Sequence, residues 1–155
     1  MRLCKAAMIT VCVAAVGAAS YATTASASDA SIKQTIKAYN PKILVAEGHV
    51  LSAIGEYKQT RQPAGVETAL SKSIGVFGAL KSKIAAQSAV APNVKKGKLK
   101  LIKGLQAVIK AYQHLKTAFA VNAVNAGAAK EQAEKAEVAV HKGRKELREG
   151  LQLLK

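Results

Sequence analysis

Lysine is the residue type whose number and spacing stand out in this chain. No acidic residue occurs from Thr68 to Lys130, and that stretch holds eleven lysines. An ammonium group on a flexible stem attracts anions without demanding one geometry, whereas arginine offers a planar fork for specific phosphate contacts. The chemistry predicted for this region is therefore ionic attachment to a polyanion.

The lysines at 95–110 are the candidate binding residues. At about 100° per residue of an α-helix, Lys96, Lys100, Lys103, Lys110 and His114 fall in one narrow row, nearly opposite the apolar row of the same segment. Lys95 and Lys98 crowd the start of this helix, where the helix dipole prefers anions. We expect an outward-facing site for an anionic envelope polymer or anionic surface. Its residues are Lys95, Lys96, Lys98, Lys100, Lys103 and Lys110.

The aromatic residues argue against specific nucleic-acid recognition. After residue 27, every aromatic side chain falls on an apolar row that predicts burial, so none remains to stack on an exposed base. These residues are Tyr39, Tyr57, Phe77, Tyr112 and Phe119. The chain also lacks the patterns of zinc fingers and basic zippers.

Catalytic and metal-binding patterns are absent from the sequence. Glu137 and His141 are four residues apart, but bundle metal sites use a repeated Glu-x-x-His spacing that does not occur here. The other histidines are His49 and His114, and there is neither a nucleophile elbow nor a glycine-rich phosphate loop. The sequence thus predicts a non-enzymatic protein with no catalytic residues, no metal and no cofactor.

Four segments must position these side chains. Apolar residues recur at alternating spacings of four and three in residues 32–57, 66–84, 101–119 and 129–154, as on helices buried along one side. Short connections force neighbouring helices to run antiparallel, so we expect an all-α, up-down-up-down four-helix bundle. Pro41 predicts either a kink in the first helix or a break, with Asn40 capping a new helix. Pro92 and Asn93 are expected in the loop before the third helix.

The N-terminal residues predict export. Arg2 and Lys5 precede an apolar run at residues 6–19, and Ala25-Ser26-Ala27 fits the cleavage rule for a secretory signal peptide. We expect residues 1–27 to be removed and residues 28–155 to form a single helical-bundle domain without a transmembrane span. Both cysteines leave with the signal peptide, and the net charge falls from +15 to +13 because Arg2 and Lys5 are lost. The expected location is extracytoplasmic: periplasm, cell wall or medium.

Two interpretations of function follow from these features. The first is an exported, non-enzymatic helical protein whose lysine-rich face docks on an anionic envelope polymer or surface. The alternative is a structural or chaperone-like protein that works through apolar helix contacts or self-association, with the charge serving only solubility.

Overall fold

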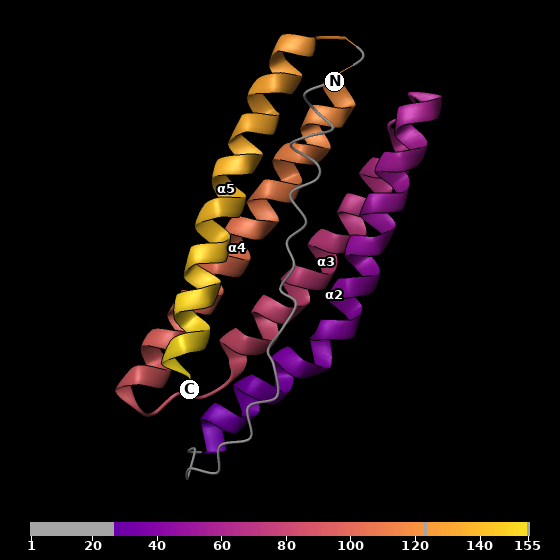
Figure 1. The fold of residues 1–155 in the computed structure, drawn as a ribbon. Coiled ribbons are helices and arrows are strands. Elements are labelled where there is room, and N and C mark those ends of the chain that lie inside the picture. Colours follow the sequence, from indigo (N-terminus) through magenta and orange to yellow (C-terminus); the bar gives the residue numbers. More distant parts are fainter. Residues whose placement is uncertain (1–26, 123, 155) are drawn as a thin grey trace.

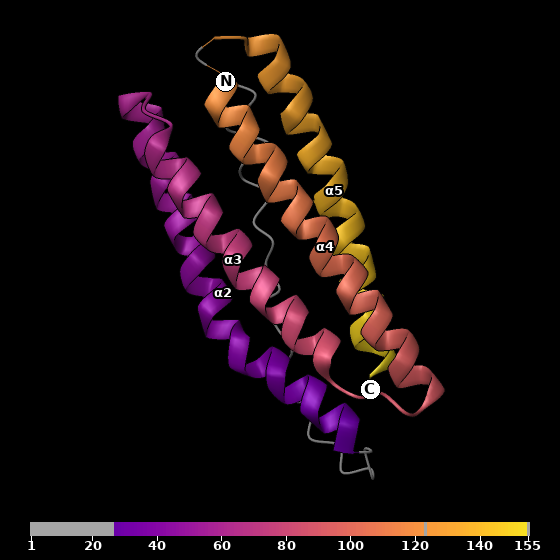
Figure 2. The same ribbon diagram turned by 180° about the vertical axis from the view of Figure 1, so that it is seen from behind.

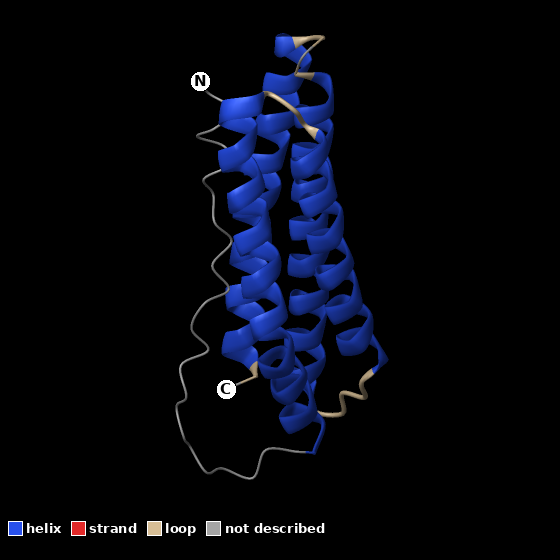
Figure 3. Ribbon diagram, turned by 90° about the vertical axis from the view of Figure 1, so that its right-hand side faces the viewer, coloured by secondary structure: helices blue, strands red, loops and turns tan. Residues whose placement is uncertain are grey.

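The structure, a computed structural model, describes residues 27–122 and 124–154, and this part of the chain forms four helices. They are α2 (Ala27–Thr60), α3 (Ala64–Ala86), α4 (Pro92–Val121) and α5 (Ala126–Leu153). The helices lie lengthwise against one another, and the chain reverses direction at each connection (Figure 1). Figure 3 shows helices and loops but no strand over the described residues. The predicted all-α bundle is confirmed, whereas the predicted signal peptide lies outside the described residues except for Ala27.

Both Pro41 and Pro92 lie within helices of the structure. Pro41 lies inside α2, which continues through it to Thr60, so the predicted alternative of two separate helices does not occur. Pro92 begins α4 instead of lying in the loop before it. A proline in the first turn of a helix is tolerated because the N–H that it lacks would have had no partner there.

The predicted apolar rows form the core. The largest side chains that are almost completely buried include Ile32 of α2, Leu70 and Phe77 of α3, and Phe119 of α4. Two aromatic pairs meet edge to face: the ring centroids of Tyr57 and Phe119 are 4.9 Å apart, and those of Phe77 and Tyr112 are 5.6 Å apart.

Tyr39 is only half-buried, so the burial that its apolar row predicts is wrong for this residue. The side chain packs against the core on one side, and the ammonium group of Lys42 lies 4.9 Å from its ring centroid. A tyrosine can lie at this boundary because its ring is apolar while its hydroxyl is polar. The remaining four aromatic side chains of the described region are buried as predicted.

Small residues bring α4 and α5 into close contact. They recur every seven residues on both helices, and all of them are buried: Gly97, Gly104, Ala111 and Ala118 on α4, and Ala129, Ala136, Gly143 and Gly150 on α5. A Cβ atom added to Gly150 would lie 3.0 Å from the carbonyl oxygen of Gly97, so the two backbones touch there. Figure 2 shows these helices side by side along their length. The contact of α2 with α3 also includes small residues, because the Ser73 hydroxyl donates to the carbonyl oxygen of Ala46 at 3.2 Å.

Polar contacts join helix ends that lie side by side. The Gln87 amide donates to Thr35 Oγ1 at 2.5 Å and joins the end of α3 to the start of α2. The Asn122 amide donates to the Tyr57 hydroxyl at 2.7 Å, where the end of α4 meets the end of α2. α2 packs mainly against α3, whereas α4 packs against both α3 and α5 and makes little contact with α2.

Candidate functional site

Four of the six predicted binding lysines are exposed on α4. They are Lys95, Lys96, Lys103 and Lys110, and none forms an ion pair with any described residue. We call these four residues the lysine face. The opposite side of α4 carries Leu101, Leu105 and Tyr112, whose burial in the core fixes the rotation of the helix and turns the lysine face outward.

Lys98 is bound within the protein. Its ammonium group donates to the carbonyl oxygen of Ala85 at 2.6 Å and to that of Gln87. These carbonyls lie at the C-terminal end of α3, where backbone oxygens have no partner within the helix and the helix dipole favours a cation. Lys98 therefore ties the start of α4 to the end of α3.

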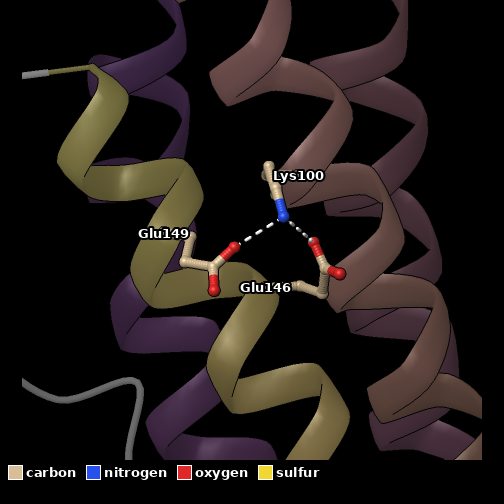
Figure 4. Close-up of polar contacts among 3 residues, drawn as sticks. All are labelled: Lys100, Glu146 and Glu149. Atoms are coloured by element: carbon tan, nitrogen blue, oxygen red, sulfur yellow. Dashed lines mark hydrogen bonds and ion pairs between the residues drawn. The ribbon is translucent and has the colours of Figure 1, made fainter.

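Lys100 also differs from the sequence-based expectation. Instead of pointing outward with its row, its ammonium group lies 2.5 Å from Glu149 Oε2 and 3.2 Å from Glu146 Oε2, so it bridges two carboxylates of α5 (Figure 4). The hydrogen bond to Glu149 raises the pKa of Lys100, and the same contact lowers the pKa of Glu149. The predicted row is thus interrupted by a residue that joins α4 to α5.

The helix that carries the lysine face, α4, contains no acidic residue. No acid lies in the first turn of α4, and the residue before the helix, Ala91, provides no side-chain cap. On α3, the lysines Lys72 and Lys83 are exposed, while Lys81 donates to the amide oxygen of Gln106 at 2.6 Å. His114, which shares the predicted row, lies 2.8 Å through Nδ1 from Gln132 Oε1 of α5.

A buried polar cluster was missed at the sequence level. Glu47 of α2 is only 6% exposed, and its Oε1 atom has no hydrogen-bond partner among the described residues. The charge of Arg144 on α5 acts on this carboxyl group, and the Glu47 charge acts on the buried hydroxyl of Tyr112 on α4. The spacing in the sequence indicates that Glu47 is buried, because it lies four residues after Ile43 and seven before Ile54, both of which are buried.

Burial controls the ionisation of this cluster. Loss of hydration raises the pKa of Glu47 from its usual 4.5 to about 7, although the nearby Arg144 charge acts in the opposite direction. Burial, and after it the Glu47 charge, also raises the pKa of the Tyr112 hydroxyl well above its ordinary value. A carboxyl group that titrates near neutral pH is therefore part of the core.

The described residues contain no group of three or more His, Cys, Asp or Glu side chains placed to hold a metal ion. His49 and His141 are exposed. Glu137 and His141 are four residues apart on α5, and the distance between Glu137 Oε1 and His141 Nε2 is 3.9 Å. A pocket of about 20 Å³ between the helices is lined only by apolar side chains, including Phe77, Leu105 and Leu147. Such a volume is about that of one water molecule, far below what an organic ligand fills.

Comparison of the chain with protein-family models, with curated proteins and with solved structures finds no significant match. Across residues 27–122 and 124–154, no helix has both the length and the apolar character of a membrane span.

Proposed function

We propose that this chain is an exported, non-enzymatic protein that binds an anionic envelope polymer or surface through its lysine face. The observation that carries the proposal is the exposure of Lys95, Lys96, Lys103 and Lys110 without an acidic partner, on a helix that contains no acid at all. Elsewhere in the bundle, the lysines of α5 stand among glutamates, as in the pairs Lys130–Glu134 and Lys135–Glu131. The outer side of α4 therefore carries positive charge with no negative charge on the same helix.

The spacing of the lysine face suits an extended ligand. Lys96, Lys103 and Lys110 follow one another at intervals of seven residues. Seven residues make about two helical turns, so these ammonium groups recur roughly every 10 Å along the helix. A linear polymer with regularly spaced anionic groups can contact several of them at once, which raises its affinity without a shaped pocket.

The chemistry of the face favours diffuse attraction over recognition of a shape. Lysines act as mobile point charges, and four of the five aromatic side chains after residue 27 are buried in the core. We therefore assign the partner to acidic polysaccharides and comparable envelope polyanions, and not to a specific nucleic-acid sequence.

Salt-dependent retention on immobilised heparin, used as a model polyanion, tests the proposal. A variant carrying K95Q, K96Q, K103Q and K110Q should elute at much lower NaCl than the unchanged protein, because salt screens exposed charges. The matched control carries K130Q, K135Q, K142Q and K145Q, which remove the same charge from α5. If the two variants elute together, net charge alone causes retention, and the alternative in which charge serves solubility is favoured.

Export is tested separately from binding. The protein recovered from outside the cytoplasm of its own host should have an intact mass that corresponds to a chain beginning at Ser28. Recovery of the full-length chain from the cytoplasm alone would contradict export. It would not change the conclusion drawn from the heparin experiment.

A further inference from the structure

A second surface, on the outside of α2, combines exposed apolar side chains with lysines. Leu44, Val45 and Leu51 are 50%, 59% and 44% exposed. All three lie on one helix, with Leu51 two turns beyond Leu44, whereas the other large apolar residues exposed in the described region are dispersed over α4, α5 and two loops: Val90, Leu99, Val124 and Val138. Single exposed apolar residues are ordinary on protein surfaces, whereas a continuous patch indicates an interaction site.

Glycines leave open space beside the patch on α2. Gly48 lies between the turns of Leu44 and Leu51, and a Cβ atom at Gly48 or Gly55 would meet nothing within 4 Å. These glycines therefore do not serve close helix packing, in contrast to those of α4 and α5. Exposed Pro41 extends the uncharged strip toward the start of α2, where the helix itself remains continuous.

Lysines lie before, beside and beyond the patch, and one exposed acidic residue, Glu56, lies on the same helix beyond Leu51. Lys33 and Lys37 precede it on α2, Lys42 lies beside it over the ring of Tyr39, and Lys58 follows it in the last turn. All four are exposed, and none forms an ion pair with a described acidic residue. Apolar side chains in the middle and lysines at the margins match a surface that is apolar beneath a layer of negative charge.

We propose that the outer face of α2 binds an anionic lipid surface. Leu44, Val45 and Leu51 enter the boundary between headgroups and acyl chains, while the lysines bind lipid phosphates. A second copy of this chain fits the surface less well, because its α2 would bring further lysines against Lys37 and Lys42. The surface is distinct from the lysine face of α4, since the two surfaces lie on helices that make little contact with each other.

Sedimentation with vesicles tests this inference. The probes are vesicles of phosphatidylglycerol with phosphatidylcholine, and vesicles of phosphatidylcholine alone. The variant L44Q/V45Q/L51Q should bind the anionic vesicles about tenfold more weakly than the unchanged protein, since insertion of apolar side chains adds to electrostatic attraction. The control V90Q/V124Q/V138Q removes three exposed apolar side chains elsewhere and should bind as the unchanged protein does.

Further variants separate the possible outcomes. Gly48→Leu adds an apolar side chain into open space and should strengthen binding to anionic vesicles. The K95Q/K96Q/K103Q/K110Q variant should keep most of its vesicle binding while losing heparin retention, so that either proposal can fail alone. Equal vesicle binding by the α2 variant and its control would overturn the inference. So would light scattering that shows a dimer disrupted by L44Q/V45Q/L51Q, because a second copy would then cover the patch.

Discussion

The carboxyl group of Glu47 makes the stability of the bundle depend on pH. Its pKa is about 7 in the folded protein and near 4.5 when the chain is unfolded and solvated. Because the folded-state pKa is the higher of the two, the neutral form favours the folded state. This contribution is fully present below pH 4.5 and is lost as the pH rises through 7.

The substitution Glu47→Gln should remove this dependence. A difference of about 2.5 pKa units corresponds to a loss of roughly 3 kcal/mol between the two ends of the window, and we expect Gln to recover about 1–3 kcal/mol at pH 8. Near pH 4 the variant and the unchanged protein should be almost equally stable. Urea unfolding at both pH values measures the effect. Equal stability of the two proteins at pH 8 would show that Glu47 is hydrated or fully compensated by the Arg144 charge.

Single side chains were the least predictable part of the candidate site. Helical geometry placed Lys96, Lys103 and Lys110 correctly on an outer face, because that placement depends only on the opposite apolar row. It could not place Lys100, whose carboxylate partners lie 46 and 49 residues away in the sequence. The bonds of Lys98 to the end of α3 likewise depend on how two helices meet.

The helices themselves could largely be predicted from the sequence, because the spacing of apolar residues indicates which side of each helix is buried. The row of α3 is buried throughout, including the polar Ser73, whose hydroxyl lies 3.1 Å from the Ala69 carbonyl oxygen and 3.2 Å from that of Ala46. The rows did not reveal how closely each pair of helices packs. That property depends on which glycines face a neighbouring backbone, and it distinguishes α4 and α5 from the rest of the bundle.

Two glycines of the same chain should respond oppositely to alanine. A Cβ atom at Gly104 would lie 2.6 Å from Leu147 Cγ and 2.9 Å from Leu147 N, so α4 and α5 must separate in Gly104→Ala. We expect a loss of about 1–3 kcal/mol from overpacking, partly offset by the higher helix propensity of alanine. Gly48→Ala enters open space and should gain up to about 1 kcal/mol. Thermal unfolding of the two variants compares them, and a stable Gly104→Ala would mean that the interface can widen without loss.

At the scale of the whole molecule, the sides of the bundle differ in their charge and in their exposed apolar surface. The outer side of α4 carries only positive charge, α5 mixes both signs, and the exposed apolar patch lies on α2. An anionic partner therefore meets a molecule with a preferred orientation, since the attraction differs from side to side. This orientation can be measured on the unaltered chain.

Acetylation of lysines in the presence of heparin should reveal which side is covered. We expect bound heparin to slow modification of the lysine face, Lys95, Lys96, Lys103 and Lys110, several-fold when the ionic strength is low. Lys142 and Lys145, which are exposed on α5, should react at nearly the same rate with and without heparin.

Lys98 and Lys100 should react slowly in both conditions, because their ammonium groups are already bound within the protein. Mass spectrometry of peptides reports each rate. Uniform protection of all exposed lysines would mean that the polyanion has no preferred side, and retention would then reflect net charge alone.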